Sequence, residues 1–188
     1  MAAVDPVQRR GEIVDAAYRL VADGGIEAAT MRRIALAAGA TTGRVTHYFN
    51  SRVDVLVAVL VEVDRRRQLR IAGHANLDPS ARLRSVVLER LPLDTARLNE
   101  QRVWLALSST GIPELRDELA RQSHHWDALI GSLIKTAGSQ GHEDDTTTSI
   151  VALIDGLSIG LTLDPRARTR RTAERVVDEL LRGLGSHD

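Results

Sequence analysis

The chain has no cysteine among its 188 residues, so a disulfide framework and a zinc site with thiolate ligands are both excluded. The GxSxG, HExxH, GxGxxG and P-loop patterns, which place reacting groups in common enzymes and nucleotide-binding proteins, are also absent. His124 and His125 are neighbours, so on a helix they point about 100° apart and do not share one ion. The run from His142 to Asp145 is expected to be a solvated loop and acidic helix start. We therefore expect no catalytic residue, cofactor or metal, and an enzyme is the least favoured class.

No apolar stretch is long enough to cross a membrane. The longest, from Ile150 to Leu163, is interrupted by Asp155 and is shorter than the roughly 20 residues that a spanning helix needs. No charged and then apolar leader precedes the first predicted helix. We therefore expect a cytoplasmic protein without a membrane partner.

The chain also lacks net charge, because 25 basic residues balance 25 acidic ones. How the charges are distributed matters more than their sum. The N-terminal part holds several arginines, among them Arg9, Arg10, Arg32, Arg33, Arg44 and Arg52. Acidic residues gather far downstream, at Asp94, Glu100, Glu114, Asp117, Glu118, Glu143, Asp144 and Asp145. The sequence thus predicts a local basic face on a neutral protein.

Residues 30–52 hold the most informative pattern in a chain whose apolar spacing is helical throughout. The first short helix has its apolar residues at helical spacing: Met31, Ile34, Ala35 and Ala38. Gly39 ends this helix, because glycine reaches the left-handed conformation at little cost, and Thr41 begins a second helix as its N-cap. Two short helices around a tight turn are the layout that presents a helix to the DNA major groove. An ordinary pair of surface helices is the alternative.

The second helix, about residues 41–48, is too short to persist alone, since helices under roughly 12 residues are marginal in water. Val45 and Phe49 lie one turn apart and supply the packing that holds it. Gly43 allows the backbone a closer approach to a duplex, and the outward side chains nearly all form hydrogen bonds, as contact with DNA requires. The DNA-binding candidates are Thr30, Arg32, Arg33, Thr41, Thr42, Gly43, Arg44, Thr46, His47, Tyr48 and Arg52.

An amphipathic helix precedes this pair and ends at Asp23-Gly24-Gly25, which completes a three-helix unit. The ordered set from Ile13 to Leu56 resembles the N-terminal DNA-binding domain of the TetR family of transcriptional regulators. Its matching positions include Gly25, Thr30, Ile34-Ala35, Ala38-Gly39, Gly43, Phe49 and Ser51-Arg52. The resemblance implies an all-α fold of about nine helices, with a DNA-binding domain at residues 1–52 and a helical ligand-binding and dimerisation domain at residues 53–188.

Two positions in the second helix of the pair depart from the usual residues of the family. At Thr46 the family usually carries a tyrosine that reaches a DNA phosphate, and at Tyr48 it often carries a histidine that does the same. The triplet His47-Tyr48-Phe49 is similar to the subgroup of betaine-responsive regulators. The resemblance therefore implies a phosphate contact by Tyr48 more readily than by Thr46. It also implies one by Arg52, where the family commonly has lysine.

The last two predicted helices carry apolar stripes, and the run ALIDGLSIGLTLDP is similar to the C-terminal domain of the same subgroup. Two such helices from each of two chains would bury one another as a four-helix bundle. The dimer-interface candidates are Ile150, Ile154, Leu157, Leu161, Val176, Val177, Leu180 and Leu184. The alternative is that both helices only complete the core of a single chain.

Large apolar side chains between the predicted helices are candidates for a ligand pocket, although such residues are more often plain core. They are Trp104, Leu107, Ile112, Trp126 and Leu129.

The helix pair and the resemblance to the TetR family together predict a DNA-binding transcriptional repressor. It is expected to bind double-stranded operator DNA as a homodimer and to be released by an unidentified small-molecule effector. The alternative, which Thr46 in place of tyrosine leaves open, is a helical ligand-binding or interaction module with little specific affinity for DNA.

Overall fold

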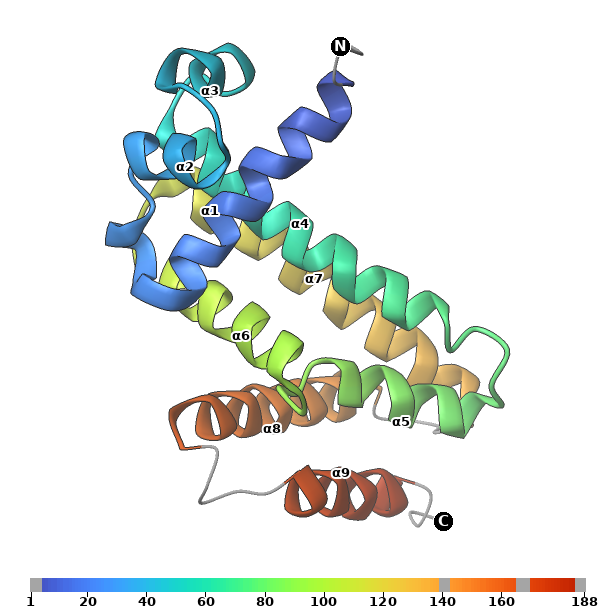
Figure 1. Cartoon of the computed structure of the whole chain (residues 1–188). Coiled ribbons are helices and arrows are strands. Elements are labelled where there is room, and N and C mark those ends of the chain that lie inside the picture. The colour runs from blue at the N-terminus through green and yellow to red at the C-terminus, as the bar shows by residue number, and fades with distance from the viewer. Residues whose placement is uncertain (1–4, 139–142, 165–169, 185–188) are drawn as a thin grey trace. The chain divides into compact units, whose positions relative to one another are not determined.

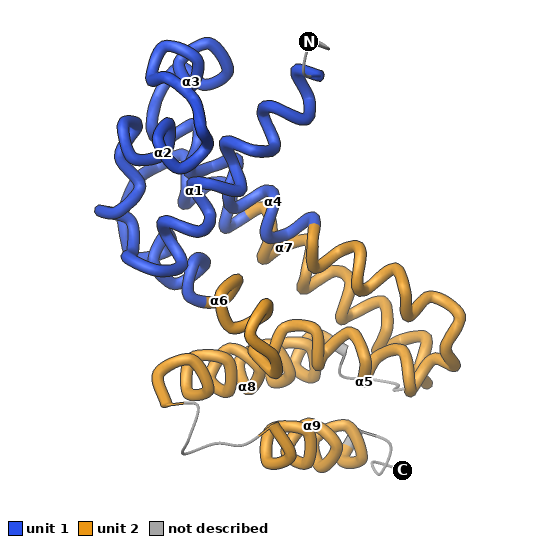
Figure 2. The backbone as a smooth tube through the Cα atoms, viewed as in Figure 1, with its two compact units in different colours: residues 1–65, 102–120 blue, residues 66–101, 121–188 orange. Residues whose placement is uncertain are grey.

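The structure is a computed structural model that describes residues 5–138, 143–164 and 170–184. Over these residues the chain forms nine α-helices and no strand, which confirms the all-α expectation (Figure 1). The chain packs as two compact units (Figure 2). Unit 1 consists of residues 1–65 and 102–120, and unit 2 consists of residues 66–101 and 121–188.

Unit 1 is built around the N-terminal helices α1 (Pro6–Ala28), α2 (Met31–Ala37), α3 (Thr42–Tyr48) and the first part of α4 (Arg52–Ala72). The end of α6 (Thr95–Ser108) and the start of α7 (Pro113–Thr136) complete it. The most deeply buried side chains of its core include Ile13, Val21, Ile34, Val45, Leu56, Leu60, Leu107 and Leu115. The core of unit 1 therefore draws on all three helices of the predicted N-terminal unit.

The break predicted after α1 is at Gly25, whose φ of 70° and ψ of −174° interrupt the helical path. A side chain at this φ would be strained, so glycine is the residue that permits the change of direction. Ala28 and Ala29 beyond it are buried and lead into the start of α2. The glycine therefore sets where the chain leaves α1 for the helix pair.

Unit 2 contains the end of α4, the start of α6, most of α7 and three further helices. These are α5 (Pro79–Glu89), α8 (Glu143–Leu163) and α9 (Arg170–Leu184). Asp78 caps α5, because its carboxylate accepts a hydrogen bond from the backbone N–H of Ala81 at 3.0 Å. Fully buried side chains of the unit 2 core include Val86, Leu91, Ile130, Ile134, Ile150, Ile154 and Val177.

The two compact units do not divide the chain at residue 52. Residues 53–65 and 102–120 pack with the N-terminal helices, so unit 1 is larger than the predicted DNA-binding domain. A division of the chain by packing need not coincide with a division by function. The functional division into residues 1–52 and 53–188 stays a prediction.

A charged cluster inside unit 2 joins the end of α4 to α5 and α6. Arg70 donates to Glu100 at 2.7 Å and to Glu89 at 2.7 Å, and Glu100 is only 5% exposed. Burial by itself lowers the pKa of the Arg70 guanidinium, but the hydrogen bonds to Glu100 and Glu89 outweigh this and leave the pKa raised. Arg70 thus stays charged and satisfies a buried carboxylate that would otherwise be costly.

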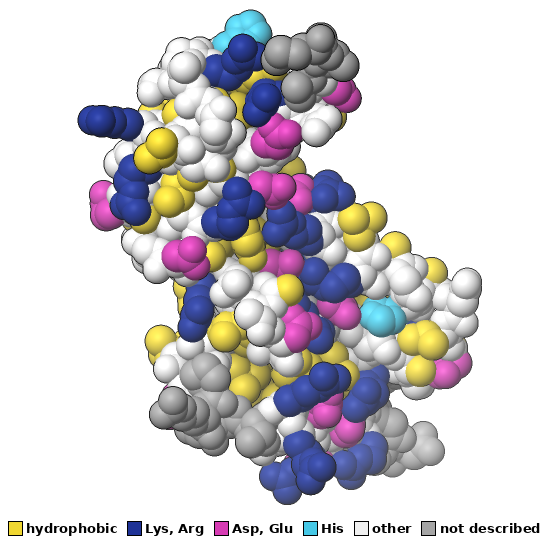
Figure 3. Space-filling view, viewed as in Figure 1, with side chains coloured by type: hydrophobic (Ala, Val, Ile, Leu, Met, Phe, Trp, Pro, Cys, Tyr) yellow, Lys and Arg dark blue, Asp and Glu magenta, His cyan; other side chains and the backbone are white. Residues whose placement is uncertain are grey.

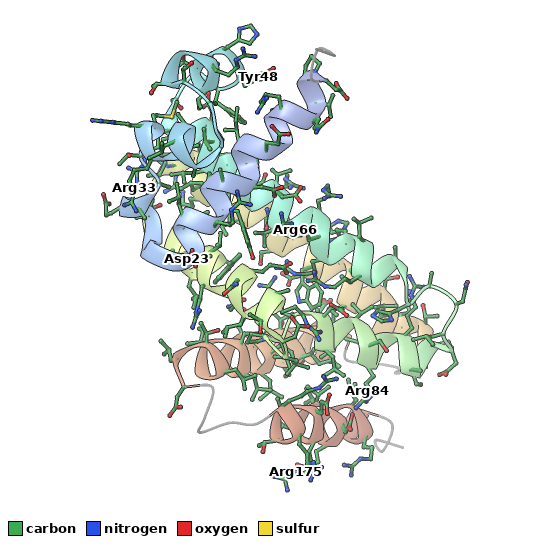
Figure 4. The ribbon with its side chains drawn as sticks, viewed as in Figure 1. Asp23, Arg33, Tyr48, Arg66, Arg84 and Arg175 are labelled. Carbon is green, nitrogen blue, oxygen red and sulfur yellow. The ribbon has the colours of Figure 1, made fainter. Side chains whose placement is uncertain are left out.

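A second ion pair joins α5 to α9. The Arg84 Nε donates to Asp178 Oδ1 at 2.6 Å and Nη2 donates to Oδ2 at 3.1 Å, a two-point contact (Figure 4). The hydrogen bonds from Arg84 lower the pKa of the Asp178 carboxyl below its ordinary value of 3.8. Both side chains keep more than a third of their exposure, so the pair is a surface pair of modest strength.

Replacing Asp178 with Asn should lower the stability of the protein by about 0.5–1 kcal/mol at neutral pH, because the ion pair between α5 and α9 is lost. A carboxyl whose pKa is lowered by folding stabilises the protein above its ordinary pKa and ceases to do so as the pH falls through the lowered value. In urea unfolding, the difference between Asp178→Asn and the unchanged protein should therefore shrink below about pH 4. The exposed neighbour Glu179 provides the control, as Glu179→Gln. If the difference in unfolding free energy between the two proteins is the same at about pH 2 as at neutral pH, the charge of the Asp178 carboxylate does not contribute to stability.

Candidate nucleic-acid interface

The two short helices of unit 1 begin at threonine caps. The hydroxyl of Thr30 accepts a hydrogen bond from the backbone N–H of Arg33 at 3.3 Å, and that of Thr41 accepts one from Arg44 at 3.2 Å. Between the helices, Gly39 has a φ of 60°, the left-handed conformation that the sequence predicts for this turn. The helix-turn-helix layout is thus determined locally, by two caps and one glycine.

Helix α3 is held on unit 1 by the two residues predicted to do so. Val45 is fully buried and Phe49 is 3% exposed, and both belong to the core cluster of unit 1. The side chains on the other faces of the helix are exposed, namely those of Thr41, Thr42, Arg44, Thr46 and His47, together with the backbone of Gly43. A set of hydrogen-bonding groups is therefore presented to solvent by a helix with a fixed position on its unit.

Tyr48 differs from the rest of the outward set, because it is half-buried and packs against the core of unit 1. Its ring meets that of His47 edge to face, with ring centroids 5.1 Å apart and an interplanar angle of 82°. Such a contact orients both rings. Tyr48 is thus partly a packing residue at the end of α3.

Three of the predicted arginines, Arg32, Arg33 and Arg44, are exposed and make no ion pair or hydrogen bond through their guanidinium groups in the described part of the chain. Basic side chains stand out at the α2 and α3 end of unit 1, and Arg33 points away from α2 (Figures 3 and 4). Arg9 and Arg10, by contrast, are engaged. Arg9 pairs with Glu12 at 2.6 Å, and the guanidinium of Arg10 lies 4.7 Å from the centroid of the Phe49 ring.

The structure gives Arg52 a different task from the phosphate contact that the sequence predicts. Its Nε donates to the carbonyl of Ala29 at 2.9 Å, and its Nη2 donates to the carbonyl of Ile26. Both carbonyls follow the break at Gly25, and the bonds are partly buried. Arg52 therefore fastens the start of α4 to the end of α1. The contact of Arg52 with a DNA phosphate stays a prediction.

A capping box begins α4. Ser51 Oγ accepts from the backbone N–H of Asp54 at 3.1 Å, and the Asp54 carboxylate accepts from the backbone N–H groups of Ser51 and Asn50 at 3.2 and 3.0 Å. These bonds fix the chain between α3 and α4. They leave Asp54 as a structural acid beside the helix pair.

The sequence interpretation missed one exposed apolar residue, Leu36 on α2, which is 81% exposed. The helical spacing could have predicted that this side chain is exposed. Residues Ile34 and Ala35 face the core, and Leu36 lies off their stripe by one residue, about 100° around the helix. An apolar side chain therefore lies on the same short helix as the free arginines.

The pattern of the family described as "BetI-type transcriptional repressor, C-terminal" matches residues 79–186, more than half of the chain, and that of "Bacterial regulatory proteins, tetR family" matches residues 13–59. The chain belongs to the TetR family. The second match covers α2, α3 and most of α1, the part that forms the helix pair. The protein is therefore a transcriptional regulator with a C-terminal part of the BetI type.

Relatives of this TetR-family regulator match it over nearly its whole length. The regulator PksA of Bacillus subtilis is 25% identical over 185 residues, which is 93% of this chain and 88% of PksA. The regulator BetI of Burkholderia mallei is 28% identical over 186 residues, 92% of this chain and 93% of BetI. A transcriptional regulator from Saccharomonospora viridis, solved in complex with choline, is 27% identical with a TM-score of 0.77, and the match covers 95% of this chain and 94% of that one.

The five residues predicted to line one ligand pocket are divided between the two units of this regulator. Trp104, Leu107 and Ile112 belong to the core cluster of unit 1, with Leu107 fully buried. Trp126 and Leu129 belong to that of unit 2. All five are therefore wholly or partly buried core residues. A ligand pocket lined by them stays a prediction.

Within unit 2, a groove of about 900 Å³ runs between α7 and α8. It is lined by small residues such as Gly131 and Ala152, and by more acidic groups than basic ones. None of the five predicted pocket residues is among its lining residues. The charged residues that line it are Asp127, Lys135, Asp144 and Asp155.

The predicted dimer stripe on α8 is already used inside the chain. Ile150, Ile154 and Leu161 are buried in unit 2, as is Val177 on α9, so these four are corrected from interface to core residues. Leu157, Val176 and Leu180 are half-buried, and the Leu184 side chain lies outside the described residues, as does His142. A different stripe of α8 faces outward, formed by Ala152, Gly156, Ile159 and Leu163.

Replacing Arg52 with Met should destabilise the protein by about 1–3 kcal/mol, because the carbonyls of Ile26 and Ala29 lose their hydrogen-bond donor in a partly buried place. Urea unfolding measures the loss, and Arg33→Met is the control, since Arg33 is exposed and makes no such bonds. Unchanged stability of Arg52→Met would contradict this structural role. A DNA-binding affinity that becomes less dependent on salt in Arg52→Met would show that Arg52 also contacts a phosphate.

Proposed function

We propose that this regulator is a repressor that binds a duplex operator as a homodimer in the bacterial cytoplasm and is released by a small-molecule effector. The observation that carries the proposal is the exposed face of α3. Its hydrogen-bonding side chains surround a helix whose opposite face is anchored by Val45 and Phe49. A short helix held rigidly in this way is suited to the major groove of DNA.

The exposed groups fall into two kinds of DNA contact. Thr30 and Thr41 accept backbone hydrogen bonds through their oxygens, so each hydroxyl proton remains for a phosphate. Arg32 and Arg33 add positive charge to the same helix pair, and Arg44 extends from the first turn of α3, where base edges are met. Phosphate contacts would position the helix pair on the duplex, and Arg44 would contact base edges and so recognise the sequence.

Homodimerisation is supported by the outward stripe of α8. Ala152, Gly156, Ile159 and Leu163 follow one another at helical spacing, and Ile159 and Leu163 are 40% and 77% exposed. The inward side of the same helix is fixed, because Ser158 donates to the carbonyl of Arg90 at 3.1 Å. We assign the outward stripe to contact with α8 of a second copy of this chain, since small residues let two helices approach closely. The two-fold symmetry of such a dimer supplies two DNA-binding helix pairs for the two half-sites of an operator.

Helix α8 would also be long and apolar enough, by length and composition alone, to cross a membrane over residues 144–163, a longer span than the run that the sequence analysis considers. A helix that is covered on one side by its own unit and on the other by a second chain is as apolar as a helix that crosses a membrane. The ion pair of Asp155 with Arg90, at 3.4 Å, lies in the middle of this span. We therefore assign the apolar character of α8 to protein contacts.

The choline bound by the Saccharomonospora viridis regulator is not carried over to this protein. Recognition of quaternary ammonium groups relies on several aromatic faces. In unit 2 the only Phe, Tyr or Trp of the sequence is Trp126, which is 3% exposed, and the guanidinium carbon of Arg90 lies 5.5 Å from its ring centroid. An effector of any class must bind the form that is released from DNA more tightly than the DNA-bound form.

Titration of labelled upstream DNA of the gene should show tight binding that weakens steeply with salt, whereas random duplex of the same length binds much less tightly. Arg44→Ala should reduce the affinity for the operator by about 1–3 kcal/mol and reduce the preference over random duplex. Arg175→Ala is the control, because Arg175 points away from α9 (Figure 4). Equal affinity for both duplexes would favour the alternative of a helical module without specific DNA binding.

Replacing Ile159 with Glu should convert the dimer to monomers, because it places a charge in the centre of the apolar stripe that a second α8 would cover. Sedimentation or light scattering measures the mass, and circular dichroism checks that the monomer stays folded. Leu69→Glu is the matched control, since Leu69 is 60% exposed on α4, away from the stripe. A persistent dimer for both variants would place the interface elsewhere.

A further inference from the structure

Thr46 uses its hydroxyl differently from the other threonines of the helix pair. Its Oγ1 donates to the carbonyl of Gly43 at 3.0 Å, one turn earlier in α3. Thr30 and Thr41 accept hydrogen bonds through their oxygens and keep their protons. Thr46 alone among these three directs its proton at its own helix, a bond that threonine commonly makes inside helices.

This bond changes what Thr46 can offer to DNA. Phosphate oxygens only accept hydrogen bonds, so a contact with phosphate would require Thr46 to give up its bond to Gly43. The side chain is nevertheless exposed on α3. With the hydroxyl proton engaged by the helix, the side chain offers an outside partner its γ-methyl group and the acceptor lone pairs of its oxygen, but no donor. Thymine presents an acceptor and a methyl group in the major groove, so the γ-methyl group is the part of Thr46 that suits it.

The surroundings of Thr46 leave this methyl group accessible. Gly43 lies three residues earlier and therefore on the same face of α3. It has no side chain, and a Cβ placed there would meet nothing within 4 Å. Arg44 and His47 flank this face, and both are exposed. The pair Gly43 and Thr46 thus forms a shallow apolar spot on an otherwise polar surface.

We propose that the γ-methyl group of Thr46 reads a thymine, through contact with the C5-methyl group of that base in the major groove. Thymine is the only base with a methyl group there, and threonine methyl groups are suited to it. The proposal rests on the proposed function, since it requires α3 to lie in the groove. It adds a base preference at one position per half-site and removes Thr46 from the phosphate contacts.

Two variants separate the methyl group from the hydroxyl. Thr46→Val keeps a methyl group in the same place and lacks the hydroxyl, whereas Thr46→Ser keeps the hydroxyl and lacks the methyl group. Deoxyuridine in place of thymine, one position at a time, removes the C5-methyl group from the operator. Fluorescence titrations of each protein with each duplex at one salt concentration form a complete cycle of methyl deletions. The same titrations repeated at several salt concentrations give the salt dependence of binding.

For the unchanged protein, deoxyuridine at one position per half-site should weaken binding about three- to fivefold per half-site, the effect expected for one buried methyl group. Thr46→Val should bind as tightly as the unchanged protein and show the same loss with deoxyuridine. Thr46→Ser should bind the thymine operator more weakly by a similar factor and lose nothing further with deoxyuridine. The salt dependence of binding should be the same for all three proteins.

The opposite results overturn the proposal. A loss for Thr46→Val equal to that for Thr46→Ser would assign the contact to the hydroxyl, and a shallower salt dependence for Thr46→Val would assign it to a phosphate. A wild-type protein that distinguishes its operator from random duplex but is insensitive to deoxyuridine at every position also contradicts it. If the wild-type protein does not distinguish operator from random duplex, the proposed function itself fails.

Discussion

The attachment of α3 to unit 1 through Val45 and Phe49 is the contact on which the DNA-binding surface depends. A helix of seven residues has too few internal hydrogen bonds to persist by itself, so its position is set by what it buries. Both anchors lie on one side, and apart from the half-buried Tyr48 the other side chains of the helix are exposed. The exposed polar groups are therefore presented at fixed positions without having to stabilise the helix that carries them.

The elements around α3 hold it from both ends. The threonine caps begin α2 and α3, and the reciprocal bonds of Ser51 and Asp54 begin α4 immediately after it. Arg52 then ties that start of α4 to the last carbonyls of α1. Arg52 thus has a structural role, whereas the arginines of α2 and α3 are exposed.

Helix α8 is apolar on more than one face. One stripe completes the core of unit 2, and another remains exposed. A stripe made of small residues with two larger ones is too poor in volume to form a core but suits close contact with an identical helix. The half-buried residues of α8 lie between the buried and the exposed stripe. The dimer proposal therefore rests on the exposed stripe alone, which a single chain leaves uncovered.

The sequence by itself determined the features whose partners are close in the chain. Caps at Thr30, Thr41 and Asp78 act over three residues, and the turns at Gly25 and Gly39 depend on backbone conformation at one residue, so local chemistry predicts them. The all-α class follows in the same way from helical spacing, as does the inward position of Val45 and Phe49.

Only the tertiary structure decided the features whose partners are distant. The carbonyls that engage Arg52 lie 23 and 26 residues away, and nothing in the local sequence distinguishes a guanidinium that meets a carbonyl from one that meets a phosphate. The separation of Trp104 from Trp126 into two cores and the choice of which α8 stripe faces inward are of the same kind. A helix that is apolar on several sides has no single periodic signal, so packing against its own unit selects the buried face and leaves the other exposed.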